Sequence, residues 1–144
     1  MSAPREQGAA VLVEVSNAMV RLHKEQFGRG PTSARSSFAG PDSLLCVLED
    51  VLLPAEVKLV EMGMHERVRD ARTSFQVATA AEFTDAVEEI VERKVRAFAS
   101  AVDPDANTVF EVFQFERGES ALDGRGDLPA GAVEPLGRGG SSEA

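Results

Sequence analysis

Apolar residues in the first part of the chain recur at intervals of three and four, which is the pattern of an amphipathic helix. They are Leu12, Val15, Met19 and Leu22. The pattern ends at Phe27-Gly28, where glycine readily takes the positive φ of a helix end, and Pro31 prevents continuation. We predict a helix from Ala9 to Phe27, preceded by a flexible N-terminus over residues 1–8.

Two short strands are predicted next, over Ser33–Phe38 and Ser43–Glu49. They flank Ala39-Gly40-Pro41-Asp42, a group of strong turn formers. The second strand is apolar at both odd and even positions from Leu44 to Leu48. A strand of this kind is typically covered on both faces, so we expect it in a central position of the sheet.

Two helices are predicted after these strands. Pro54 suits the first turn of a short helix, Pro54–Glu61, which Gly63 stops. A longer helical pattern runs from about His65 to Glu92 without Pro or Gly. Its apolar positions are Val68, Ala71, Phe75, Phe83, Ala86, Val87 and Ile90. Thr79 is the one polar residue on this stripe, which leaves a continuous, a bent and a broken helix open.

A second pair of strands, Lys94–Val102 and Thr108–Glu116, closes the predicted domain. On the last strand apolar residues occupy both faces: Phe110 and Val112 on one, and Val109, Phe113 and Phe115 on the other. The order of elements is therefore α-β-β-α-α-β-β. Two hairpins most simply give an α+β fold, with a four-stranded, mostly antiparallel sheet packed with helices.

The predicted core occupies one domain over residues 9–116, because all eight Phe residues lie between Phe27 and Phe115. A composition of 43% hydrophobic and 27% charged residues is typical of a globular protein. Residues 117–144 are rich in Gly, Pro, Ser and acidic residues and have no periodicity. We predict that they form a disordered, acidic tail.

The net charge of −9 disfavours binding to nucleic acid and to anionic lipid. No run approaches the roughly 20 apolar residues that span a bilayer. Cys46 is the only cysteine, which excludes an internal disulfide and fits a reducing compartment. We therefore predict a cytoplasmic protein, whose association with a membrane would be indirect, through a partner.

Candidate catalytic and metal-binding residues are few. His23, His65 and Cys46 do not have the spacing that a zinc site uses. Cys46 lies mid-strand among Leu and Val, where a thiol is usually inert core filling. No serine has a G-x-S-x-G setting. We predict no catalytic residue, no metal and no cofactor, and a protein that is not an enzyme.

Arginines are the remaining candidates for a binding site. Arg29 and Arg35 flank the first predicted turn, and Arg69 and Arg72 share a face of the long helix. If these four side chains converge, they can bind an anion or an acidic segment of a partner. The more ordinary interpretation is a solvated helix face with local ion pairs, as neighbouring Glu66 suggests.

The segment Gly28-Arg29-Gly30-Pro31 also has two interpretations. Glycine-rich turns can present backbone N–H groups to a phosphate. However, this segment follows a helix and precedes a strand, whereas phosphate-binding loops run from strand to helix. A helix stop followed by a tight turn is the favoured interpretation.

The sheet is apolar on both faces, but the chain offers only about three helices to cover it. Either the first helix crosses the second face or a partner covers it. An uncovered apolar face would mark an interface. We therefore expect a homodimer or a stable contact with another protein.

Several segments together resemble a known family. They are Glu25-Gln26-Phe27-Gly28-Arg29-Gly30-Pro31, Val51-Leu52-Leu53-Pro54-Ala55-Glu56, Val68-Arg69-Asp70-Ala71-Arg72, Phe83–Ile90 and Arg93-Lys94-Val95-Arg96-Ala97-Phe98. In their order and spacing, from about Ser16 to Glu116, they are similar to the MpsC-like domain family, which is named for a Na+-translocating membrane potential-generating system. The chain differs from the family pattern at Leu53, where a Thr helix cap is usual, and at Glu92, where a Gly usually ends the long helix.

The resemblance implies a small cytosolic protein, sometimes found beside membrane systems for cation or inorganic-carbon uptake, and it carries over no catalytic residues. Two functional hypotheses follow. The first is a non-enzymatic accessory or regulatory module that binds a protein partner. The alternative is a sensor of a small anion or a nucleotide that uses Arg29, Arg35, Arg69 and Arg72.

Overall fold

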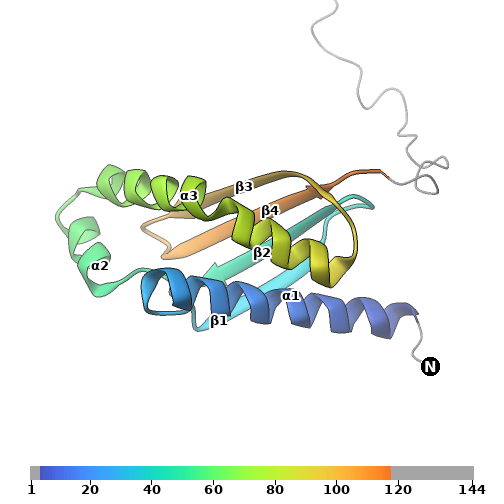
Figure 1. The fold of residues 1–144 in the computed structure, drawn as a ribbon. Coiled ribbons are helices and arrows are strands. Elements are labelled where there is room, and N and C mark those ends of the chain that lie inside the picture. The colour runs from blue at the N-terminus through green and yellow to red at the C-terminus, as the bar shows by residue number, and fades with distance from the viewer. Residues whose placement is uncertain (1–3, 118–144) are drawn as a thin grey trace, which may run out of the picture.

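A computed structural model describes residues 4–117 of the 144-residue chain (Figure 1). Within this range three helices and four strands follow one another in the predicted order. They are α1 (Pro4–Phe27), β1 (Ser33–Phe38), β2 (Ser43–Glu49), α2 (Pro54–Glu61), α3 (His65–Val91), β3 (Val95–Asp103) and β4 (Thr108–Phe115). The α+β fold class is confirmed, and α3 is continuous through Thr79.

The four strands form one antiparallel sheet in the order β1-β2-β4-β3. The strands β2 and β4 are therefore central, as the two-sided apolar pattern of β2 predicts. In the register of the sheet, Leu45 lies opposite Val112 and Val47 lies opposite Phe110. The outer strands β1 and β3 come from the two hairpins, one on each side of this central pair.

Both long helices pack on the same face of the sheet (Figure 1). The helix α1 lies over β1 and β2, α3 lies over β3, and the two helices contact each other. The core lies between helices and sheet. Its largest fully buried side chains are Phe113, Phe115, Met19, Leu44, Leu48 and Leu52. Phe98 of β3 stacks on Phe113, with ring centroids 4.7 Å apart.

The N-terminal boundary differs from the prediction. The helix α1 begins at Pro4 and not at Ala9, so residues 4–8 are helical. Proline is well tolerated at the first helical position, because an N–H there has no partner within the helix. At the other end, residues 118–144, the main part of the predicted acidic tail, lie outside the described residues.

The segment after α1 is a helix stop, in agreement with the favoured interpretation. Gly28 has a φ of 81°, and its N–H donates to the Lys24 carbonyl at 2.8 Å. Gly30 lies close to α1: a Cβ there would stand 3.2 Å from the Val20 carbonyl oxygen. The two glycines therefore serve the turn and its packing.

The long helix ends at Glu92 in the left-handed region, with a φ of 63° and a ψ of 39°. A residue with a Cβ is strained there by about 1–2 kcal/mol. We predict that Glu92→Gly raises the free energy of unfolding by about 1 kcal/mol, as measured by urea denaturation. Glu92→Ala is the control, because it removes the same carboxylate and keeps the Cβ. Equal stabilisation by both variants would contradict the explanation.

Candidate functional site

The second face of the sheet carries no helix among residues 4–117. Because α1 lies beside α3, it does not cross this face, and the expectation that β2 is covered on both sides is wrong within this range. We call this surface the open face. Its apolar residues are Leu45 and Val47 of β2, Ala99 and Ala101 of β3, and Phe110 and Val112 of β4. Phe110 and Val112 are each 39% exposed.

The edges of the open face differ from its centre. On β1 the outward residues are polar: Arg35 lies opposite Val47, and Ser37 lies opposite Leu45. On β3 the outward residues are small, because Ala99 lies opposite Val112 and Ala101 opposite Phe110. An apolar centre beside a polar rim is the arrangement of a protein–protein interface.

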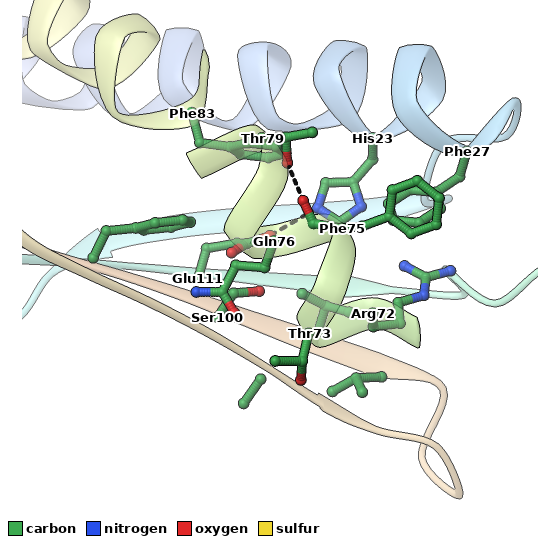
Figure 2. A pocket seen from close by; sticks show the side chains of 14 residues that line it. His23, Phe27, Arg72, Thr73, Phe75, Gln76, Thr79, Phe83, Ser100 and Glu111 are labelled. Carbon is green, nitrogen blue, oxygen red and sulfur yellow. Dashed lines mark hydrogen bonds and ion pairs between the residues drawn. The ribbon is translucent and has the colours of Figure 1, made fainter. Parts of the chain in front are cut away.

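The helix-covered face contains a buried pair that the sequence analysis did not predict. His23 Nε2 of α1 lies 2.8 Å from Glu111 Oε2 of β4 (Figure 2). The residues are only 4% and 2% exposed, respectively. The spacing of both residues in the sequence is compatible with burial. His23 lies four residues after Met19, on the apolar side of the helix. Glu111 points to the same face of its strand as Val109 and Phe113.

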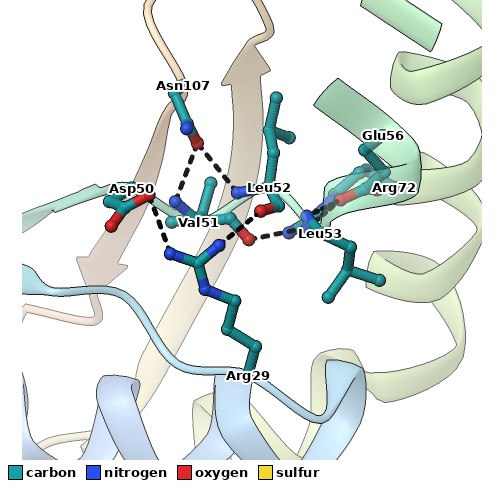
Figure 3. Close-up of polar contacts among 8 residues, drawn as sticks. All are labelled: Arg29, Asp50, Val51, Leu52, Leu53, Glu56, Arg72 and Asn107. Carbon is teal, nitrogen blue, oxygen red and sulfur yellow. Dashed lines mark hydrogen bonds and ion pairs between the residues drawn. The ribbon is translucent and has the colours of Figure 1, made fainter. Parts of the chain in front are cut away.

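Arg72 is buried as well, at 7% exposure. Its Nε and Nη2 donate to the two carboxylate oxygens of Glu56, at 2.9 and 2.6 Å, and Nη2 also donates to the Val51 carbonyl (Figure 3). The guanidinium lies over the ring of Phe27, 3.9 Å from its centroid. The inward face of α3 therefore includes Arg72, whereas Phe75, expected in the core, is 46% exposed.

Arg29 reaches the same segment from the other side (Figure 3). Its Nη1 donates to the Leu52 carbonyl at 2.8 Å, and its Nη2 lies 2.8 Å from Asp50 Oδ1. Arg29 and Arg72 therefore hold the connection between β2 and α2, and each is paired with a carboxylate. Their positions indicate a structural role.

Asn107 completes this connection from the β3–β4 turn. Its Oδ1 accepts hydrogen bonds from the backbone N–H groups of Val51 and Leu52, each at 2.8 Å (Figure 3). The two N–H groups belong to buried residues. Asn107 itself has a φ of 53°, in the left-handed region that asparagine tolerates well. Asn107 lies between the two predicted strands Lys94–Val102 and Thr108–Glu116, where asparagine is an ordinary turn residue, so the sequence alone does not indicate these long-range hydrogen bonds.

The other two predicted arginines lie elsewhere. Arg35 is on β1 at the edge of the open face, opposite Val47. Arg69 is exposed on α3 and pairs with Glu66, one turn away on the same helix. Only Arg29 and Arg72 come together, so the four side chains do not line one basic pocket.

Cys46 is fully buried on the helix-covered face, and Ser36 Oγ donates to its sulfur at 3.3 Å. Burial raises the pKa of this thiol from 9.0 to about 11, and the negative charge of Glu111 adds to the increase. A thiolate is the reactive form of cysteine, so Cys46 is poorly suited to nucleophilic chemistry.

The raised pKa predicts a loss of stability at high pH. The unfolded chain releases the thiol proton near pH 9 and the folded chain near pH 11. Below pH 9 the stabilising contribution of the neutral thiol is complete, and it disappears as the pH rises to about 11, a loss of about 2–3 kcal/mol. Urea denaturation of the wild type and of Cys46→Ala across this range checks the prediction. Identical pH dependence of the two proteins would contradict it.

A family model described as "Na+-translocating membrane potential-generating system (MpsC)" matches residues 9–117. The chain belongs to the MpsC family. No curated protein and no solved structure matches it. In this MpsC protein, no helix of the described residues is long and apolar enough to cross a membrane. Residues 4–117 also contain no group of three or more His, Cys, Asp or Glu side chains that could hold a metal.

Proposed function

We propose that this MpsC protein is a non-enzymatic accessory or regulatory module in the cytoplasm, which binds a protein partner through its open face. The partner is a second copy of the chain or another protein of the Na+-translocating system that the family name describes. Its association with the membrane is then indirect, through that partner. The observation that carries the proposal is the open face itself.

The arrangement of the open face supports binding to a protein. Its apolar side chains lie on neighbouring strands in register, so they form one continuous surface. Contiguous exposed apolar patches are uncommon on soluble monomers unless they bind something. The alanines of β3 present little side chain, which allows close approach of another sheet or helix.

The test compares two substitutions of the same type. Val112→Glu places a charge in the centre of the open face, whereas Val77→Glu places it on α3, where Val77 is already 74% exposed. Analytical ultracentrifugation of the full chain measures self-association. Co-purification from native cells after mild solubilisation, followed by mass spectrometry, measures contact with components of a membrane system.

We expect the wild type and Val77→Glu to dimerise or to retain a specific membrane-system component, and Val112→Glu to lose that contact at least about tenfold, because burial of an unpaired charge is costly. Circular dichroism shows whether Val112→Glu is folded. A wild-type monomer that retains no such component would overturn the proposal. Undiminished contact in folded Val112→Glu would exclude the open face as the interface.

A further inference from the structure

The open face is acidic at the end of its strands nearest the β3–β4 turn. Glu49 of β2, Thr108 of β4 and Asp103 of β3 lie side by side there in one row of the sheet. The fourth member of the row is Ser33 of β1. Both carboxylate residues are exposed, and the ion pairs formed within residues 4–117 include neither of them. This row therefore holds two negative charges and no positive one.

The opposite end of the open face carries a cation, Arg96. It is the extra residue of a β-bulge, because the register of β3 against β4 shifts between Val95 and Ala97. Its Nη1 donates to Gln114 Oε1 at 2.5 Å, and Gln114 points to the open face, two residues after Val112. Bulges commonly redirect a side chain. Here the bulge places an exposed guanidinium at the end of the open face.

Neighbouring carboxylates do not cancel the positive charge at this end. Asp42 and Glu116 line the same surface hollow as Arg96 and Arg117. Asp42 pairs with Arg117 and also with Arg93. Three arginines therefore stand against two carboxylates, and the two ends of the open face have opposite charge.

A second copy of the chain can supply the complementary charges. Identical chains associate most often about a two-fold axis, and sheets packed face to face commonly keep their strands aligned within about 30°. The axis then runs either along the strands or across them. An axis along the strands brings the acidic ends of the two copies together. An axis across the strands exchanges the ends, so the row of Glu49 and Asp103 meets Arg96 of the second copy. Charge complementarity selects the axis across the strands.

The same axis also matches the rest of the open face. When it passes between the row of Phe110 and the row of Val112, each strand packs on its own copy in the opposite direction. Apolar residues then meet apolar residues at the centre, and polar residues meet polar ones at the rim. The contacts between copies are Phe110 with Val112, Val47 with Leu45, Ala101 with Ala99, Glu49 with Ser43 and Asp103 with Arg96.

The size of the open face fits a reversible dimer. Its four strands, spaced about 4.8 Å apart and extending over about seven residues each, project to about 20 Å by 23 Å. Two copies would cover about 900 Å² in projection, and the accessible surface of a pleated sheet is larger than its projection. This area lies at the lower end of specific interfaces. We therefore expect dissociation in the micromolar range.

We propose that two copies of this MpsC protein pack open face to open face about a two-fold axis across the strands, with Arg96 of each copy paired with Asp103 of the other. This inference rests on the proposed function and deepens it, because it commits the open face to a second copy of the chain. The symmetry repeats the ion pair, so one substitution changes the interface in two places.

The first test reverses single charges in the full chain. Arg96→Glu and Asp103→Lys each place like charges opposite one another at both ends of the interface. Arg69→Glu makes the same change of charge on α3, away from the open face, and is the control. Analytical ultracentrifugation at about 150 mM salt limits the long-range repulsion that follows from the net charge of −9. We expect the two reversals to weaken the dimer at least about tenfold and the control to stay within about threefold of the wild type.

The second test mixes Arg96→Glu with Asp103→Lys in equal amounts. In a heterodimer the introduced glutamate faces the introduced lysine, and the unchanged Asp103 faces the unchanged Arg96. Both ion pairs are then restored. Native mass spectrometry distinguishes the heterodimer from the two homodimers by mass. We expect heterodimers to exceed either homodimer at least about tenfold, whereas a mixture of Arg69→Glu with Asp103→Lys shows no such excess.

Circular dichroism establishes that each variant is folded. Asp103 Oδ1 also accepts the Ala106 N–H within the turn, so Asp103→Lys is the variant at greater risk. The comparison of Arg96→Glu with Arg69→Glu requires no change at Asp103 and decides the proposal even if Asp103→Lys does not fold.

Several results would overturn the proposal. One is a wild type that remains monomeric up to about 1 mM. Others are equal dimerisation of Arg96→Glu and Arg69→Glu, the absence of excess heterodimers in the mixture of folded variants, and a dimer that persists in folded Val112→Glu. A monomeric wild type that retains a membrane-system component, with loss of that component in Val112→Glu, would overturn this inference and leave the proposed function standing.

Discussion

Arg72→Ala is expected to lower the free energy of unfolding by about 3–5 kcal/mol, the cost of removing one member of a buried ion pair. The substitution removes both hydrogen bonds to Glu56 and the bond to the Val51 carbonyl. It also removes the contact with the Phe27 ring. Among residues 4–117, the Glu56 carboxylate, itself mostly buried, would keep only the N–H of Leu53 as a partner. Urea denaturation at neutral pH measures the change.

Arg69→Ala is the matched control for this experiment. Arg69 lies one turn earlier on α3, and its pair with Glu66 is exposed. We expect a change of less than about 0.5 kcal/mol, since surface pairs of this kind contribute little. A similar loss in the two variants would show that the burial of Arg72 is not what matters.

Asn107→Ala is expected to cost about 2–4 kcal/mol, because it leaves two buried N–H groups without an acceptor. These belong to Val51 and Leu52, which are 2% and 1% exposed. Alanine also tolerates the positive φ of this position less well than asparagine. The unfolding midpoint in urea and the melting temperature both measure the effect.

Asn107→Asp separates the side-chain acceptor from the general sensitivity of the turn. Aspartate keeps an oxygen at the same position and also tolerates the left-handed region. We expect this variant to remain within about 1 kcal/mol of the wild type. A loss as large as that of Asn107→Ala would show that the hydrogen bonds to the Val51 and Leu52 N–H groups are not the source of stability.

Successive side chains of β4 point alternately to the two faces of the sheet. Glu111 points to the helices, and its neighbours Phe110 and Val112 point to the open face. The sequence predicted this alternation for the apolar residues, and the same rule extends to Glu111. A carboxylate between two apolar residues is usually assigned to solvent, which is why only the structure identified the buried pair with His23.

Arg69 and Arg72 illustrate a limit of sequence patterns. They lie on the same helix at a spacing of three, and both have nearby carboxylates in the sequence. One is exposed and paired with Glu66 within its own helix. The other is buried, and its partner Glu56 comes from α2, the preceding helix. Local spacing predicts the first type of pair, but the second depends on how α2 and α3 pack.

The sequence by itself determined the element order and the helix stops, because these depend on short-range periodicity and on the backbone freedom of residues such as Gly28 and Gly63. Only the tertiary structure decided which face of the sheet α1 covers. An apolar stripe requires that a helix be buried, but it does not specify the surface that buries it. The open face results from that choice, and the connection held by Asn107 also depends on tertiary structure, because it joins segments that are distant in the chain.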